Sequence, residues 1–489
     1  MAMPAAVCLP DTARLLVAGG DGRLALDPAT GLNRYLCRPF PDPDLLAFGA
    51  STASVVSVAG FAAAGRMRDH MSDAISRLPA DAVYAGEQAR IRAELLTLCG
   101  IPTSDAPDVL FAASGTDLHR IAARMAGSRA GYLRAIVVDA AETGSGVPEA
   151  LHGRRYPAAV DGSSHADGVE VVHVPVRRSD GRPRPAIQID AAVTALTDEA
   201  VNEGRAVLLI LVDVSKTGLI APSPACALAL SSRHGDAMRV LVDACQFRLA
   251  PVSLRAYLDQ GFAVALTGSK FMGGPVFSGA MLVPRGPGWR RAPRTETHPG
   301  VLLRWEAALE EMRAFAALSG TDVAAFLRAF AWAVDRRLRA SPCFTLLPRP
   351  KLDREPFTSG SWDSEPSIIP FRVHHANGKP FDRDESRLLY RWLQMDMGDL
   401  PVFQDNNAAR ALASLRCQFG QPVTYGRHAG MPIAALRLST SARMVVEAVS
   451  GDADAVIERA LRALDKAEML AKHFHLIPRA SSAEIRRAG

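Results

Sequence analysis

The stretch Val240-Leu241-Val242-Asp243-Ala244-Cys245-Gln246 decides the fold, because it is an apolar strand that ends on a carboxylate. The next apolar run, Phe262 to Leu266, ends in Thr267-Gly268-Ser269-Lys270. The 27-residue step from Asp243 to Lys270 fits one helix and one strand. Parallel strands joined by a helix bring their carboxyl ends to one edge of a sheet, where ligand-binding groups gather. We therefore expect Asp243 and Lys270 to lie on neighbouring strands at that edge.

The same alternation of apolar runs and helical patterns extends through the first 300 residues. The run Ala206 to Val212 is wholly apolar, which is typical of a strand buried on both faces. The sequence predicts an α/β fold, with a mostly parallel sheet flanked by helices. The other expected strands are Asp108 to Ala112, Leu133 to Val138, Val169 to Val174, Arg239 to Val242, Phe262 to Leu266 and Gly279 to Val283.

The pattern changes after Pro299, where a long helical region runs from Leu302 to Arg339 with a break near Ser319-Gly320. Shorter strands and two further helices then indicate a smaller α+β domain. We expect residues 1–55 to form an N-terminal segment that packs with the small domain. Residues 56–300 are expected to form the large domain, and 301–489 the small C-terminal domain.

Composition excludes several classes of function. Hydrophobic residues make up 48% of the chain and charged residues 22%, and the net charge is only +5. No Lys/Arg run with interleaved aromatic residues indicates nucleic-acid binding, and the longest apolar stretch is too short to span a membrane. Seven cysteines without paired spacing, and an N-terminus without an export signal, predict a reduced, cytoplasmic protein. The histidines show no ligand spacing with carboxylates, so no metal site is expected.

Lysine is scarce, and only Lys216 and Lys270 precede residue 351. Six of the 56 basic residues are lysines. Arginine can replace lysine as a surface charge, but it cannot supply a neutral amine that attacks a carbonyl. Lys270 is therefore a candidate nucleophile.

Three further groups accompany Lys270. Ser114, Gly115 and Thr116 follow a strand and open a helix. The free backbone N–H groups there suit a phosphate, or else the turn is a plain helix N-cap. Asp243 suits a protonated ring nitrogen, or else forms a turn. Arg437 lies inside an apolar strand and needs a partner, either a substrate carboxylate or an internal acidic residue. Pyridoxal phosphate chemistry needs four groups from the protein. These are a phosphate site, a carboxylate for the ring nitrogen, an amine and an arginine that binds a carboxylate.

Over roughly residues 75 to 445 the chain resembles the fold-type I pyridoxal-phosphate enzymes, nearest the class V aminotransferase and cysteine desulfurase group. The resemblance implies that the Ser-Gly-Thr turn binds the phosphate and that Asp243 and Gln246 hold the ring nitrogen and the 3′-oxygen. It implies a phosphate contact from Thr267 and a Schiff base on Lys270. It also implies a homodimer with shared active sites, in which Thr297 reaches the phosphate of the partner subunit.

Two departures from the family pattern stand out. The family has a Glu-His pair that places a histidine on the ring, whereas this chain has Glu142-Thr143. The family has an asparagine after a serine near the cofactor, whereas this chain has Ser215-Lys216. Lys216 would bring a second amine to the site, as a substrate-binding or acid/base group, or else point to solvent.

The resemblance implies an enzyme that acts on an amino acid through an external aldimine and a quinonoid. The expected reaction is transamination or elimination or replacement at the β- or γ-carbon. A cysteine desulfurase or C–S lyase is the alternative, although alignment on Gln421-Pro422 puts Phe419 rather than Cys417 at the nucleophile position, so Cys417 is expected to be structural. A non-catalytic pyridoxal-phosphate-binding regulator is the alternative of another class.

Overall fold

A computed structural model of the chain describes residues 9–102, 104, 106–127, 132–154, 168–286, 288–290 and 298–478. Thr297, predicted as a cofactor contact, lies outside the described residues.

The large sheet has seven strands in the order β2-β8-β7-β6-β5-β3-β4. All neighbouring pairs are parallel except those of β8, which runs antiparallel to both β2 and β7. The mostly parallel α/β fold predicted from the sequence is confirmed. The strands are β2 (Asp108–Ala112), β3 (Leu133–Val138), β4 (Val169–Val174), β5 (Ala206–Val212), β6 (Met238–Asp243), β7 (Ala263–Thr267) and β8 (Gly279–Val283).

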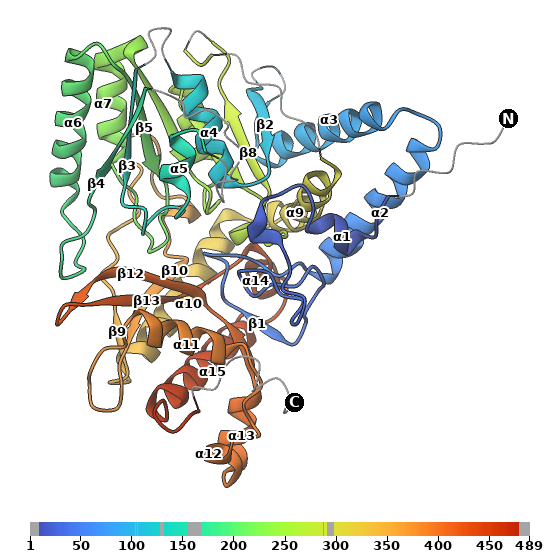
Figure 1. Cartoon of the computed structure of the whole chain (residues 1–489), viewed down its shortest axis with the longest axis vertical. Coiled ribbons are helices and arrows are strands. Elements are labelled where there is room, and N and C mark those ends of the chain that lie inside the picture. Colours follow the sequence, from blue (N-terminus) through green and yellow to red (C-terminus); the bar gives the residue numbers. More distant parts are fainter. Residues whose placement is uncertain are drawn as a thin grey trace.

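Helices join and cover these strands, with α6 and α7 at the left of the sheet in Figure 1. Five of the strands are wholly or almost wholly buried, as their apolar sequences require. The helices of this part are α2 (Val58–Ile75), α3 (Ala80–Leu98), α4 (Gly115–Ala126), α5 (Val147–Leu151), α6 (Ala186–Asn202), α7 (Pro224–His234), α8 (Pro251–Asp259) and α9 (Pro299–Ala316).

The C-terminal part contains an antiparallel sheet of four strands in the order β12-β13-β10-β9. It lies below the large sheet in Figure 1, next to α10 and α11. Its elements are α10 (Gly320–Arg339), β9 (Phe344–Leu346), β10 (Ile368–Val373), α11 (Arg383–Leu393), α12 (Pro401–Gln404), α13 (Asn407–Ser414), β11 (Arg416–Gln418), β12 (Gly420–His428), β13 (Met431–Ser439), α14 (Ala442–Glu447) and α15 (Ala453–Lys472).

The N-terminal segment runs from α1 (Thr12–Leu16) through β1 (Leu45–Ala47) and packs beside both α9 and the C-terminal part. Strand β1 pairs in parallel with β11, and Gly49 bridges to Ser439 at the end of β13. These pairings bring residues 49–54 between the two sheets. The division of the chain into domains at residues 55 and 300 stays a prediction.

Across the part of the chain that the structure describes, no single helix is long and apolar enough to cross a membrane. Helices α9 and α10 meet the requirement only as a pair, and the pair is bent by 98°.

Candidate active site

One cavity collects the predicted site residues at the carboxyl edge of the large sheet. The cavity has a volume of about 180 Å³ and opens to solvent. Every site residue predicted from the sequence lines it, except Thr297, which is not described. These lining residues are Ser114, Gly115, Thr116, Glu142, Thr143, Ser215, Lys216, Asp243, Gln246, Thr267, Lys270 and Arg437.

The turn that opens α4 forms one end of the cavity. Ser114 caps the helix, accepting a hydrogen bond from the backbone N–H of Asp117 at 3.3 Å. Gly115 is required here, because a Cβ at this position would lie 2.8 Å from Cys245 Sγ. The close approach aims the N-terminus of a twelve-residue helix into the cavity, where the helix dipole and free N–H groups favour an anion.

Asp243 lies at the carboxyl end of β6 and is 7% exposed. Its Oδ1 accepts a hydrogen bond from the backbone N–H of Cys245 at 3.1 Å, and its Oδ2 lies 3.2 Å from His119 Nε2. Burial acts to raise the pKa of Asp243, but His119 and the hydrogen bond from Cys245 outweigh it and hold the pKa well below its usual range. The carboxylate is therefore a fixed negative charge facing the cavity.

His119 was not predicted, and it is almost completely buried on α4. Its Nδ1 lies 2.9 Å from the carbonyl oxygen of Gly115, which can only accept, so Nδ1 carries a hydrogen. The ring therefore lies between Asp243 and the Gly115 turn.

Lys270 follows β7 in a left-handed conformation, with φ of 64°. Its carbonyl oxygen accepts hydrogen bonds from Ser54 Oγ at 2.6 Å and from the Gly273 N–H at 3.0 Å. A Cβ on Gly268 would lie 2.6 Å from Ala308, so the loop can pack closely on α9. Burial lowers the pKa of the Lys270 amine, and Asp243 partly offsets this effect. The low pKa favours the neutral, nucleophilic amine.

Glu142 and Ser215 line the cavity, but their side chains bond mainly to other protein side chains. The buried Glu142 carboxylate pairs with Arg177 at 2.7 Å and accepts hydrogen bonds from Ser215 Oγ and Thr217 Oγ1, each at 2.7 Å. Burial acts to raise its pKa, but these partners bring the pKa of Glu142 below its usual value. Thr143 differs, because its buried Oγ1 has no hydrogen-bond partner within the described residues and is available to a ligand.

Arg437, on β13, is 1% exposed. Its guanidinium donates to Thr52 Oγ1 at 2.8 Å and to the carbonyl oxygens of Gln421 and Lys216 at 2.5 and 3.3 Å. Burial lowers the pKa of Arg437 to about 10, which leaves it charged at neutral pH. Within the part of the chain that the structure describes, no ion pair joins Arg437 to a carboxylate. A buried charge without a counter-ion suits a ligand carboxylate.

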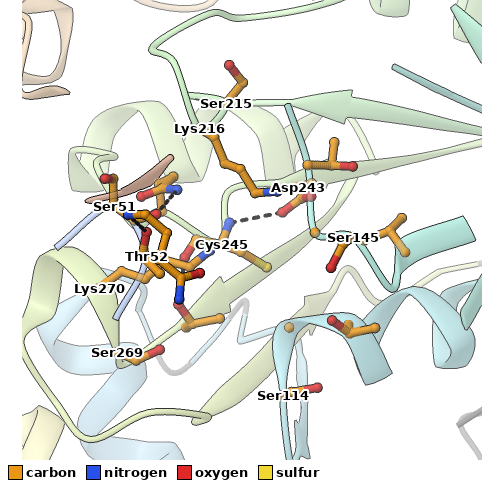
Figure 2. Close-up of a pocket in the computed structure, with 18 of the residues that line it drawn as sticks. Ser51, Thr52, Ser114, Ser145, Ser215, Lys216, Asp243, Cys245, Ser269 and Lys270 are labelled. Atoms are coloured by element: carbon orange, nitrogen blue, oxygen red, sulfur yellow. Dashed lines mark hydrogen bonds between the residues drawn. The ribbon is translucent and has the colours of Figure 1, made fainter. Parts of the chain in front are cut away.

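The N-terminal segment supplies residues that sequence reasoning missed. Arg23, Tyr35, Ser51 and Thr52 all line the cavity, although they lie far from the strand-end motifs in the sequence. Arg23 donates to Thr116 Oγ1 at 3.3 Å and pairs with Asp21. The Ser51 carbonyl oxygen accepts a hydrogen bond from Gln246 Nε2 at 3.0 Å. Figure 2 shows Ser51 and Thr52 beside Lys270, on the side of the cavity opposite Ser145.

Cys417 lies outside the cavity. It is fully buried in β11, which pairs with β1, and burial raises the pKa of its thiol to about 11. A buried, protonated thiol in a paired strand cannot act as a mobile nucleophile. Among the described residues, no group of three or more His, Cys, Asp and Glu side chains could hold a metal ion.

Comparison with known sequences finds no matching family model and no matching curated protein. Comparison with solved structures finds a NifS-like protein with a TM-score of 0.51 and 14% identity, covering 85% of this chain and 98% of that one. The cystine C–S lyase C-DES, in complex with cysteine persulfide, matches with a TM-score of 0.50 and 14% identity, covering 87% and 97%. Serine palmitoyltransferase from Sphingomonas wittichii matches with a TM-score of 0.50 and 15% identity, covering 89% and 88%.

These matches cover nearly the whole length of each neighbour. The chain therefore has the fold of the fold-type I enzymes, as the sequence predicted. At 14–15% identity the likeness concerns the fold, and the function has to be argued from the cavity.

Proposed function

We propose that this protein is a pyridoxal-phosphate-dependent enzyme that acts on an amino acid, as a transferase or a lyase. The observation that carries the proposal is one cavity with a lysine of lowered pKa and an ionised, buried carboxylate, at the ends of neighbouring parallel strands. When bound, pyridoxal phosphate withdraws electrons from the α-carbon of the substrate.

The residues present fit this cofactor. The cavity offers an anion site at the α4 N-terminus, next to Arg23. Asp243 provides a fixed negative charge for a protonated ring nitrogen. Two buried oxygens, Thr143 Oγ1 and Gln246 Oε1, have no partner among the described residues and are free for ligand contacts.

Each residue then has a role in the proposed reaction. Lys270 would carry the cofactor through its amine and, once released, move a proton at the substrate α-carbon. Asp243 would keep the ring nitrogen protonated, with His119 holding the carboxylate in place. Ser114, Gly115, Thr116 and Thr267 would hold the phosphate. Arg437 would bind the substrate carboxylate.

Reconstitution tests the proposal directly. The full chain incubated with pyridoxal phosphate should show a visible absorption band, and borohydride should fix one cofactor to Lys270, as located by mass spectrometry of the peptides. The K270A variant should show neither the band nor the tag. A wild-type protein that folds but takes up no cofactor would overturn the proposal.

A panel of amino acids then separates the possible reactions. Keto acid without ammonia indicates transamination, keto acid with ammonia indicates elimination, and sulfide from cysteine or cystine indicates a C–S lyase. A protein that binds the cofactor on Lys270 but converts no amino acid is a regulator rather than an enzyme. A cytoplasmic homodimer remains part of this proposal, and sedimentation measures its oligomeric state.

A further inference from the structure

Lys216 enters the cavity from a tightly held turn after β5. Val214 adopts a left-handed conformation with φ of 60°, the Ser215 N–H donates to the Leu219 carbonyl oxygen at 2.7 Å, and the Lys216 N–H donates to the Glu142 carbonyl oxygen at 2.9 Å. The buried Asp213, at the start of the turn, pairs with Arg354 at 2.7 Å. The backbone that carries Lys216 is therefore fixed on both sides.

The Lys216 amine faces charged groups from four elements. These are Arg437 on β13, Lys270 after β7, Glu142 after β3 and Asp243 on β6. Figure 2 shows the side chain reaching toward Asp243. The Glu142 carboxylate pairs with Arg177, and Asp243 Oδ2 lies 3.2 Å from His119 Nε2. Within the described residues, no hydrogen bond or ion pair engages the amine itself.

This environment disfavours the ammonium form. Burial, followed by the positive charge of Arg437, lowers the pKa of Lys216 to about 7. At neutral pH a large share of the molecules therefore carries a neutral amine at this position, which can accept a proton.

The contact between Lys216 and Arg437 indicates which group could donate a proton to the Lys216 amine. The Lys216 carbonyl oxygen accepts from Arg437 Nη1 at 3.3 Å, so the two residues border the same part of the cavity. A substrate carboxylate held by Arg437 would bring the α-ammonium, one carbon away, into the space that the Lys216 amine faces.

We propose that Lys216 is the base that receives a proton from the α-ammonium group of the incoming amino acid. The proposal rests on the function proposed above. The substrate nitrogen loses one proton and keeps its electron pair, and the Lys216 amine becomes an ammonium. The substrate amine would then carry a free electron pair and be ready to react.

Competitive labelling with acetic anhydride tests the amine without any turnover. The full chain is labelled across pH 5 to 11, with and without pyridoxal phosphate, and the six lysines are resolved by mass spectrometry. Labelling of Lys216 should reach half its maximum near pH 7, with the exposed Lys351 and Lys379 as reference amines in the same sample. A half-maximum above pH 9 for Lys216 overturns the proposal.

Rapid-mixing spectroscopy tests the proton transfer. In the wild type, the rate at which substrate displaces Lys270 should rise with pH through about 7. K216M should lose this pH step and slow the displacement by about 10²-fold at pH 8. K216R keeps a charge but cannot act as a base, so it should be as slow as K216M. A K216R variant with the wild-type rate and pH step contradicts the proposal.

Thermal unfolding gives a further readout. Because the folded state lowers the pKa of Lys216 below its unfolded value near 10.4, protonation favours unfolding. The resulting cost in stability is complete below pH 7 and fades as the pH rises toward 10. K216M should therefore melt at a higher temperature than the wild type at pH 6, and the difference should shrink by pH 9. Equal melting at both values would count against the inference.

The two proposals can fail separately. If borohydride fixes the cofactor to Lys270 while Lys216 labels only above pH 9, the proton-transfer role falls and the cofactor function stands. If no cofactor attaches to Lys270, the proposed function falls, whatever the labelling profile of Lys216.

Discussion

The floor and the wall of the cavity are built in different ways. The floor consists of Ser114, Lys216, Asp243, Thr267 and Lys270, which lie at or just after the carboxyl ends of the parallel strands. The wall consists of Arg23, Tyr35, Ser51 and Thr52 from the N-terminal segment, with Gln421 from the small sheet. The floor therefore follows from sheet topology, whereas the wall depends on pairings between distant parts of the chain.

Arg437 joins the two regions. It donates to the Lys216 carbonyl oxygen on the floor and to Thr52 and Gln421 on the wall. The chemistry expected of the floor needs fixed charges on rigid strands, while the wall sets access and substrate position. Changes to the floor should therefore act mainly on kcat, and changes to the wall mainly on KM.

Asp243→Asn should produce the largest effect. The amide keeps the shape of the side chain but loses the charge that would hold a protonated ring nitrogen. We expect kcat to fall by roughly 10²- to 10⁴-fold while the cofactor still attaches to Lys270. Steady-state kinetics and borohydride tagging measure the two properties. Asp190→Asn, on α6 and outside the cavity, is the control that should leave kcat unchanged.

Arg437→Lys tests the junction of floor and wall. Lysine keeps a charge but loses the planar fork, so the substrate carboxylate and the Thr52 hydroxyl lose their donors together. Hydrogen bonds to charged groups contribute about 1.5–3 kcal/mol, so kcat/KM should fall by roughly 10- to 150-fold, mostly through KM. The buried Arg248, which does not line the cavity, provides the matched control. An equal rise in KM for Arg248→Lys would show that replacing any buried arginine weakens substrate binding. The proposal that Arg437 binds the substrate carboxylate would then lose its support.

The sequence predicted most of the floor and almost none of the wall, for a physical reason. In parallel strands the carboxyl ends meet at one edge, so an aspartate after one strand and a lysine after the next must be neighbours. Ser51 and Thr52 reach the site through the bridge from Gly49 to Ser439, and no local pattern encodes that pairing. His119 was missed although it lies one helical turn after Gly115, a spacing that could have placed it beside Asp243.

Thr52→Val tests whether the wall contributes to function. The Thr52 hydroxyl accepts hydrogen bonds from Arg437 Nη2 at 2.8 Å and from the Gln421 N–H at 3.0 Å. Valine has the same shape without the acceptor, and a buried donor left unpaired costs about 1–3 kcal/mol. We expect kcat/KM to fall several-fold to about 10²-fold, with kcat nearly unchanged. Thr52→Ser keeps the oxygen and should behave as the wild type. If valine and serine give the same KM, the wall only encloses the cavity.

Cys417→Ala should have the smallest effect on activity, and it separates the remaining reaction classes. Cys417 lies in β11, beside the strand β1 that anchors the wall, and its thiol is buried and protonated. Alanine should destabilise the fold by about 1 kcal/mol, measured by chemical denaturation, and change kcat less than twofold. A desulfurase that used Cys417 as its nucleophile would instead lose nearly all transfer of sulfur from cysteine. The thiol could reach the cavity only if β11 first separated from β1. A loss of sulfur transfer in Cys417→Ala would therefore mean that the wall opens during turnover. The comparison between a rigid floor and a fixed wall would then fail.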